Sequence, residues 1–162
     1  MKIGFLTGAR SEYGVMRQLI QRVSEDSFFT LVIYATGMHF QQKYGLTINE
    51  LKADNFGLIV EMPCYTEKQR DKKDDFVALI DVISAGLISN RPDILYLIGD
   101  RLEAYAGALA AHFLRIPVAH FAGGQITKGL LTISTATTFP ISHLFTSLPI
   151  SMRMSDFSRY LS

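Results

Sequence analysis

A short apolar run that ends in charged residues constrains the fold of this chain more than any other feature. Residues 94–98 are continuously apolar, a glycine and the pair Asp100 and Arg101 follow at once, and a helix-like pattern begins at Glu103. This order predicts a buried parallel strand, a tight turn and the N-terminus of a helix. In open α/β sheets ligands bind just beyond the carboxyl ends of the strands, so Asp100 and Arg101 are candidate functional residues. The alternative is that the pair forms only a helix cap and a surface ion pair, because Asp is a favoured N-cap residue.

The rest of the chain alternates between strand and helix patterns in the same way. Further strands are predicted at residues 3–7, 29–35, 56–62 and 116–121. Helices are predicted at residues 76–89 and 103–114, and a short helix is predicted after a capping box of Thr47 and Glu50. A further helix is predicted after residue 14, and its apolar face consists of Val15, Met16, Leu19, Ile20 and Val23. The polar residues 63–75 are predicted to form a solvated loop. This alternation predicts an α/β fold with a doubly wound parallel sheet.

Composition and short motifs exclude several classes of function. The net charge of +1 and the lack of a basic stripe argue against a nucleic acid or a membrane surface as partner. A lone Cys64 excludes an intramolecular disulfide and a cysteine-based zinc site. With no signal-peptide pattern at the start and no run long enough for a membrane span, a reducing cytoplasm is the expected location. The turn after residues 3–7 lacks the GxGxxG fingerprint, so a nicotinamide cofactor is rejected.

The predicted strand ends bring together the residues that can carry chemistry. If the sheet is parallel, the segments that follow its strands share one edge. These segments contribute Arg10, Glu12, His39, Asp100, Arg101 and Gln125. Cations beside a carboxylate suit a phosphorylated or nucleotide-linked ligand and an acid–base step. His39 is open to two interpretations, a ligand contact or a side chain that only fills a loop.

Several of these segments resemble the UDP-N-acetylglucosamine 2-epimerase family, in particular its hydrolysing, sialic-acid-pathway branch. The matching segments are residues 7–14 (TGARSEYG), 36–39 (TGMH), 44–47 (YGLT), 91–93, 99–103 (GDRLE), 116–120 and the glycine pair 123–124, and they span residues 1–129. The resemblance implies the N-terminal half of a GT-B-type fold, in which two Rossmann-like domains hold the nucleotide sugar between them. It also implies elimination of UDP from UDP-N-acetylglucosamine, addition of water and reprotonation at C2, with no metal or redox cofactor.

The resemblance implies roles for individual residues. Arg10 and Arg101 correspond to contacts with the diphosphate, Gly14 and His39 to other substrate-binding positions, and Asp100 to a catalytic carboxylate. Gln125 stands where the family has a catalytic Glu, and an amide cannot transfer a proton. The family tends to form homo-oligomers. The motifs are shared by relatives that act on N-acetylglucosamine and on diacetylated bacillosamine, so they leave the UDP-sugar open.

The chain departs from the family pattern after residue 129. Residues 131–137 carry no ionisable group, where the family has an acid and an Arg-His pair, and the family's second, UDP-binding domain is not among the 162 residues. One hypothesis is a frameshift near Leu130, because a one-base shift lets Thr132 be read as Asp and residues 136–137 as Arg-His. The alternative is a genuine segment that docks on the sheet as an edge strand or short helix. We therefore expect a Rossmann-like domain over residues 1–129 and an atypical tail over residues 130–162, which is out of frame under the first of these two hypotheses.

Two functions follow from these expectations. The first is a truncated, UDP-hydrolysing UDP-N-acetylglucosamine 2-epimerase, which shows little or no turnover as an isolated chain because half of its cleft is missing. The alternative is a non-catalytic Rossmann-like module that pairs with a separate second half. An unrelated response-regulator-like domain is disfavoured, because such a domain needs an acidic pair after its first strand and residues 7–9 offer none.

Overall fold

The computed structural model describes residues 1–64 and 72–121, which form a parallel sheet with helices on both faces. The strands are β1 (Lys2–Thr7), β2 (Thr30–Thr36), β3 (Leu58–Met62), β4 (Ile94–Ile98) and β5 (Val118–Phe121). They lie in the order β3-β2-β1-β4-β5, and each neighbouring pair is parallel. The prediction of an α/β fold with a doubly wound parallel sheet is therefore confirmed.

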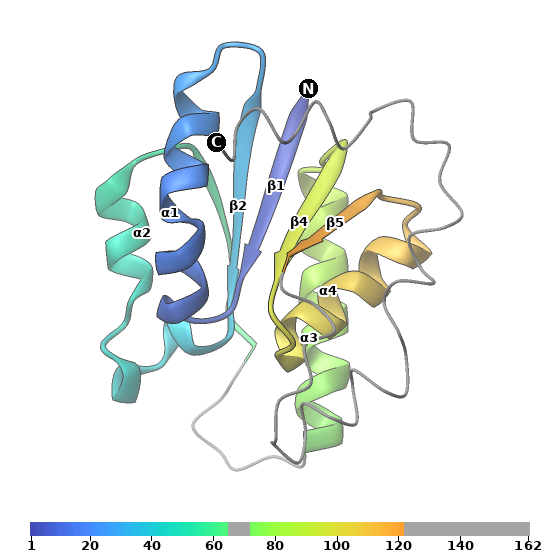
Figure 1. The fold of residues 1–162 in the computed structure, drawn as a ribbon. Coiled ribbons are helices and arrows are strands. Elements are labelled where there is room, and N and C mark those ends of the chain that lie inside the picture. The colour runs from blue at the N-terminus through green and yellow to red at the C-terminus, as the bar shows by residue number, and fades with distance from the viewer. Residues whose placement is uncertain (65–71, 122–162) are drawn as a thin grey trace.

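The helices form one layer on each face of the sheet. Helices α1 (Arg10–Glu25) and α2 (Ile48–Asp54) cover one face, and α3 (Lys72–Ser89) and α4 (Leu102–Phe113) cover the other (Figure 1). Two short 3-10 helices, η1 (Gly37–Phe40) and η2 (Gln42–Tyr44), connect β2 to α2. The change of face between β1 and β4 makes the carboxyl ends of these two strands the topological switch point of the sheet.

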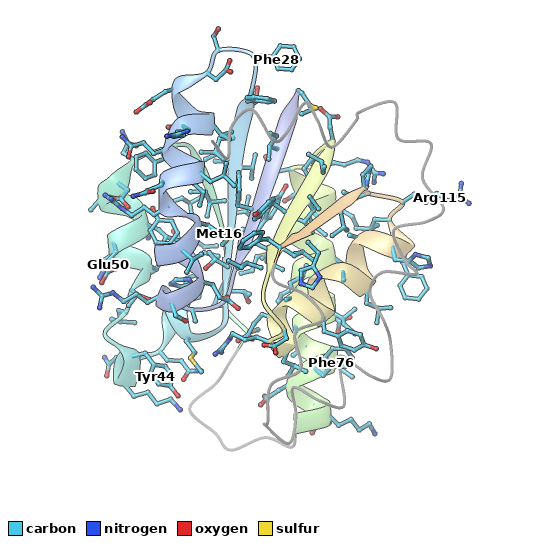
Figure 2. The ribbon with its side chains drawn as sticks, viewed as in Figure 1. Met16, Phe28, Tyr44, Glu50, Phe76 and Arg115 are labelled. Carbon is cyan, nitrogen blue, oxygen red and sulfur yellow. The ribbon has the colours of Figure 1, made fainter. Side chains whose placement is uncertain are left out.

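Helix α1 packs through most of the predicted face, since Met16, Ile20 and Val23 are buried as expected. Its buried apolar residues are Tyr13, Met16, Ile20 and Val23, a spacing of three to four residues that follows one side of the helix. Figure 2 shows Met16 between the helix and the sheet. Val15 was expected in this face, but 65% of its surface is exposed. The prediction was wrong there because Tyr13, a residue with a polar tip, occupies the buried position instead.

The second core layer depends on small residues in α3 and α4. A Cβ atom added at Gly107 of α4 would lie 2.3 Å from Leu6 Cδ2 of β1, and one added at Gly86 of α3 would lie 2.3 Å from Met62 Sδ of β3. Both helices therefore approach the sheet as closely as glycine allows, which explains their position over β1 and β3.

Local boundaries and caps differ from the sequence predictions in three places. Helix α3 begins at residue 72 rather than 76, with two acidic residues in its first turn where the helix dipole favours negative charge. Residues 72–75 are thus helical rather than loop, and residues 65–71 lie outside the described part. Strand β5 begins at residue 118, because the backbone N–H of Ile116 bonds to the end of α4. The predicted capping box is wrong: within the described residues the side chain of Thr47 makes no cap hydrogen bond, and its hydroxyl pairs with His39.

None of the helices in the described part of the chain combines the length and the hydropathy that a bilayer crossing requires.

Candidate functional site

A cavity of about 220 Å³ opens at the carboxyl edge of the sheet, between the segments that follow β1, β2 and β4. Its lining comes from the start of α1, from the 3-10 region and from the residue before α4, and consists of Ala9, Arg10, Ser11, Met38, Tyr44, Thr47 and Arg101. Figure 2 shows Tyr44 at the opposite end of the molecule from Phe28, which lies before β2 at the amino edge. The cavity occupies the place where open α/β sheets bind ligands.

Two helices begin beside this cavity. Helix α1 starts after Ala9 and α4 starts after Arg101, and neither of these N-cap residues makes a side-chain cap hydrogen bond in the described part of the chain. The N-terminal N–H groups of a helix and its dipole favour an anion. The N-cap residue of α4 is Arg101, so the alternative interpretation, in which Asp100 is the N-cap residue, is not borne out. Asp100 is partly buried and precedes Arg101 in the turn after β4.

Arg101 lies between two buried carboxylates. Its Nη2 lies 3.2 Å from Glu103 Oε1, and its Nε lies 3.3 Å from Glu103 Oε2 and 3.5 Å from Glu12 Oε1. The backbone N–H of Gly8 donates to Glu12 Oε2 at 2.7 Å. Burial, together with the negative charge of Glu103, raises the pKa of Glu12 to about 7, against the hydrogen bond from Gly8 and the charge of Arg101.

Two glycines make room for Glu103. A Cβ atom at Gly8 would lie 2.5 Å from Glu103 Cγ, and one at Gly37 would lie 2.7 Å from Glu103 Oε1. Gly37 also has a φ of +63°, a conformation that side chains rarely adopt. The backbone N–H of Met38 donates to the carbonyl of Gly8 at 2.8 Å and ties the two segments together. Gly8 of the TGARSEYG segment and Gly37 of the TGMH segment therefore make room for the packing of the GDRLE segment.

His39 is fully buried behind the cavity. Its Nε2 lies 2.9 Å from Thr7 Oγ1 and its Nδ1 lies 2.7 Å from Thr47 Oγ1. Because the Thr7 hydroxyl donates to the carbonyl of Ala9, we assign the ring proton to Nε2 and a donated hydrogen bond from Thr47 to Nδ1. Burial lowers the pKa of His39 to about 4, so the ring is neutral at pH 7. The lining of the cavity, as far as the structure describes it, does not include this residue.

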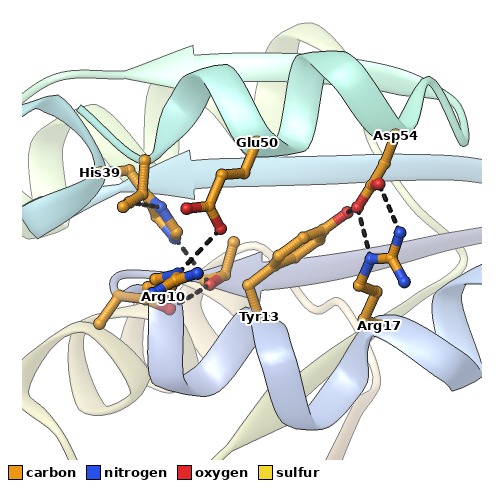
Figure 3. A network of polar contacts seen from close by, with 9 residues as sticks. Arg10, Tyr13, Arg17, His39, Glu50 and Asp54 are labelled. Carbon is orange, nitrogen blue, oxygen red and sulfur yellow. Dashed lines mark hydrogen bonds and ion pairs between the residues drawn. The ribbon is translucent and has the colours of Figure 1, made fainter. Parts of the chain in front are cut away.

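Arg10 lines the cavity from the first turn of α1. Its Nε donates to Glu50 Oε2 of α2 at 3.0 Å, and its side chain is largely exposed (Figure 3). Arg10 also borders a larger groove of about 740 Å³ between α1 and α2, and Gly14 lies in that groove rather than in the cavity. The structure thus brings Arg10 and Arg101 to one cavity and places Gly14 one turn of helix away.

Further along the groove, a polar network joins α1 to α2. The Tyr13 hydroxyl donates to Asp54 Oδ2 at 2.7 Å, and Arg17 Nη2 donates to Asp54 Oδ1 at 2.6 Å (Figure 3). The hydrogen bond to Asp54 and burial raise the pKa of Tyr13, with burial the larger cause. The network fixes α2 against α1 and so sets the width of the groove.

Sequence reasoning did not foresee the roles of Glu103, Thr7 and Thr47. Glu103 is part of the GDRLE segment, but its neighbours in space follow β1 and β2, and no local pattern links them. The one signal in the sequence was an acidic residue, Glu103, in a helix that is otherwise alanine-rich; the structure shows that this residue is buried. Gln125 and the predicted boundary at residue 129 lie outside the described residues, as does the predicted tail. The described residues contain no cluster of three or more side chains of metal-ligating type.

Comparisons with known proteins identify the family of this chain. A family described as UDP-N-acetylglucosamine 2-epimerase matches residues 21–131. The UDP-N,N'-diacetylbacillosamine 2-epimerase (hydrolyzing) of Legionella pneumophila is 35% identical over 130 residues, which are 76% of this chain and 33% of that protein. Polysialic acid biosynthesis protein P7 of Escherichia coli is 32% identical over 128 residues, which are 78% of this chain and 33% of that protein.

A solved structure shows the same fold. The UDP-GlcNAc 2-epimerase from Neisseria meningitidis, crystallised with UDP-GlcNAc, superposes with a TM-score of 0.73 at 18% identity and covers 99% of this chain and 43% of that one. The chain spans about a third of the length of the curated relatives it matches. The resemblance to the GT-B-type epimerases is confirmed, and the chain belongs to the UDP-N-acetylglucosamine 2-epimerase family.

Proposed function

We propose that the carboxyl edge of this domain is its share of a UDP-sugar site in a hydrolysing UDP-N-acetylglucosamine 2-epimerase. One observation carries the proposal: Arg10 and Arg101 line a single cavity, and two helix N-termini begin beside it. Arginine side chains and helix N-termini both favour phosphate groups, and here both sources of positive potential lie at the topological switch point of the sheet. A diphosphate is the part of a UDP-sugar that this edge suits.

The proposed chemistry begins with removal of a proton from C2 of the sugar and expulsion of UDP. Asp100 stands next to the cavity-lining Arg101 and is the proposed acid–base residue for that step. The cations stabilise the negative charge that develops on the departing diphosphate. Gln125 replaces the second acid–base group of the family and can orient a substrate but not exchange a proton with it.

The sugar itself is part of the proposal. The relatives are described as acting on UDP-N,N'-diacetylbacillosamine in Legionella pneumophila and on UDP-N-acetylglucosamine in Neisseria meningitidis. Both substrates share the UDP group that would contact Arg10 and Arg101, so the arginines do not choose between them. We propose that the protein is a cytoplasmic UDP-sugar epimerase and that it forms homo-oligomers. Light scattering on the purified chain measures its oligomeric state.

Release of UDP tests the function directly. The purified 162-residue chain is incubated with each of the two UDP-sugars, and the UDP that is released is measured by chromatography. The affinity of the chain for UDP is measured separately by calorimetry. We expect UDP to bind at millimolar concentrations and turnover to be weak or absent, because these 162 residues span only about a third of the length of the relatives. Turnover by the chain that is lost in Asp100→Asn would contradict the expected inactivity. Lack of UDP binding would contradict the proposed site.

A second candidate is a non-catalytic module that pairs with a separate second half. The chain spans about a third of the length of these relatives, and this short span is the observation that favours the second candidate. The chain is mixed with a separately expressed C-terminal part of the Legionella pneumophila relative. Co-elution of the two parts would support pairing, and separate elution would contradict it.

The frameshift hypothesis for residues 130–162 also stays a proposal. The DNA sequence around codon 130 decides it, because the shifted frame must spell Asp at position 132 and Arg-His at 136–137. Any other codons there would contradict a frameshift.

A further inference from the structure

Arg101 is restrained on several sides although it lines an open cavity. Its guanidinium contacts both oxygens of Glu103, one oxygen of Glu12 and, through Nη2, the sulfur of Met38 at 3.4 Å. Its side chain keeps 33% of its surface exposed, on the side of the cavity. By contrast, the side chain of Arg10 pairs with one carboxylate among the described residues, that of Glu50, and is 72% exposed. The two arginines of the cavity therefore differ in how firmly they are held.

The restraint on Arg101 is costly in terms of stability. The side chains of Glu103 and Glu12 are only 3% and 8% exposed, so two carboxylates share one cation in a desolvated place. Among the described residues, Glu12 Oε1 is buried without a hydrogen-bond partner. Buried ion pairs of this kind rarely stabilise a fold compared with apolar side chains of the same volume. The space for Glu103 also requires glycine at two positions, Gly8 and Gly37.

We propose that Glu103 and Glu12 are positioning residues that hold the Arg101 guanidinium in the orientation in which it receives the diphosphate of a UDP-sugar. This inference rests on the proposed function for the identity of the ligand. Glu103 fixes one edge of the planar guanidinium through two oxygens, as a fork-shaped pairing requires. Glu12, itself anchored by the N–H of Gly8, contacts Nε from the side of β1. An arginine held in this way loses little conformational entropy when a phosphate binds.

A double-mutant cycle on the full 162-residue chain tests the positioning role. UDP affinity is measured for the wild type, Glu103→Gln, Arg101→Lys and the double variant. We expect Glu103→Gln to weaken UDP binding about tenfold, the loss of one charge-assisted contact. In the Arg101→Lys background the same change should have little effect, because Glu103 acts through the guanidinium. An equal loss in both backgrounds, or no loss in the wild-type background, would overturn the inference.

The Nε–H signal of Arg101 gives a readout that does not depend on UDP. In NMR spectra of the ¹⁵N-labelled chain, this signal is assigned by its disappearance in Arg101→Lys. The signal should shift and exchange faster with water in Glu103→Gln and also in Glu12→Gln. The second variant keeps the positioning role testable if Glu103→Gln fails to fold. Glu61→Gln, at an exposed carboxylate paired with Lys52, is the matched control and should leave the signal unchanged.

The outcomes separate the two proposals. A wild type that binds no UDP at millimolar concentrations refutes the proposed function, while the Nε–H signal still reports whether the carboxylates hold Arg101. A wild type that binds UDP with an Nε–H signal insensitive to both Glu103→Gln and Glu12→Gln overturns the positioning role alone.

Discussion

Replacing Glu12 with Gln should change how the stability of the domain depends on pH. The pKa of this buried carboxyl rises from 4.5 to about 7 on folding. Between these values the folded state keeps a proton that the unfolded state has released. The contribution of Glu12 to stability is therefore fully present below pH 4.5 and is lost as the pH rises through 7. From pH 5 to pH 8 the loss amounts to about 2.5 kcal/mol.

His39 titrates in the opposite sense over nearly the same range. Its pKa falls from 6.5 to about 4 on folding, because the neutral ring is buried between two threonine hydroxyls. Its contribution is present above pH 6.5 and is lost as the pH falls toward 4, by about 2 kcal/mol between pH 8 and pH 5. In the wild-type chain the contributions of Glu12 and His39 therefore largely cancel. Glu12→Gln removes one of them and exposes the other.

Urea unfolding followed by far-UV circular dichroism at pH 5, 6, 7 and 8 measures the effect. The free energy of unfolding of Glu12→Gln should fall by about 2 kcal/mol from pH 8 to pH 5, while that of the wild type changes little. The difference in free energy of unfolding between Glu12→Gln and the wild type should therefore rise by about 2.5 kcal/mol from pH 5 to pH 8, in favour of the variant. Glu61→Gln, which removes an exposed carboxylate, is the control and should track the wild type. Parallel curves for wild type and Glu12→Gln would refute the reasoning.

Three further substitutions test the packing around the site, each by urea unfolding. Thr47→Val removes the hydroxyl that donates to His39 Nδ1 and should lower the free energy of unfolding by about 1–2 kcal/mol, whereas an unchanged midpoint would show that the bond is dispensable. Gly107→Ala places a Cβ 2.3 Å from Leu6 Cδ2 and should cost about 1–3 kcal/mol, unless α4 can move away at no cost. Val15→Ser, on the exposed side of α1, should stay within about 0.5 kcal/mol of the wild type; a larger loss would place Val15 in the core after all.

The strands and most of the buried face of α1 followed from local patterns, but the burial of Tyr13 and the exposure of Val15 did not. The continuous apolar run of residues 94–98 was enough to predict β4, because a strand buried on both faces needs apolar side chains at every position. In α1 the same periodic reasoning admitted Val15 and left out Tyr13, since hydropathy alone cannot tell that the tyrosine hydroxyl would find Asp54 of α2. The partner lies 41 residues away in the chain.

The capping box failed for the same physical reason. Thr47 and Glu50 have the right spacing, but the Thr47 hydroxyl bonds to His39 and the Glu50 carboxylate pairs with Arg10. Both partners are brought there by the turn after β2 and by the packing of α2 on α1. A local motif competes with every polar group that tertiary packing delivers, and here the packing prevailed.

The amino-acid sequence was sufficient to show that this chain alternates between strand and helix, that charged residues follow its strands, and that its motifs are those of one epimerase family. Those properties are local, since they depend on the order of side chains along a few turns of backbone. The charge state of Glu12, the burial of His39 and the contacts of Arg101 are not local. They arise because β1, β2 and β4 lie side by side and bring Gly8, Gly37 and Glu103 into contact, and burial and neighbouring charge then set each pKa.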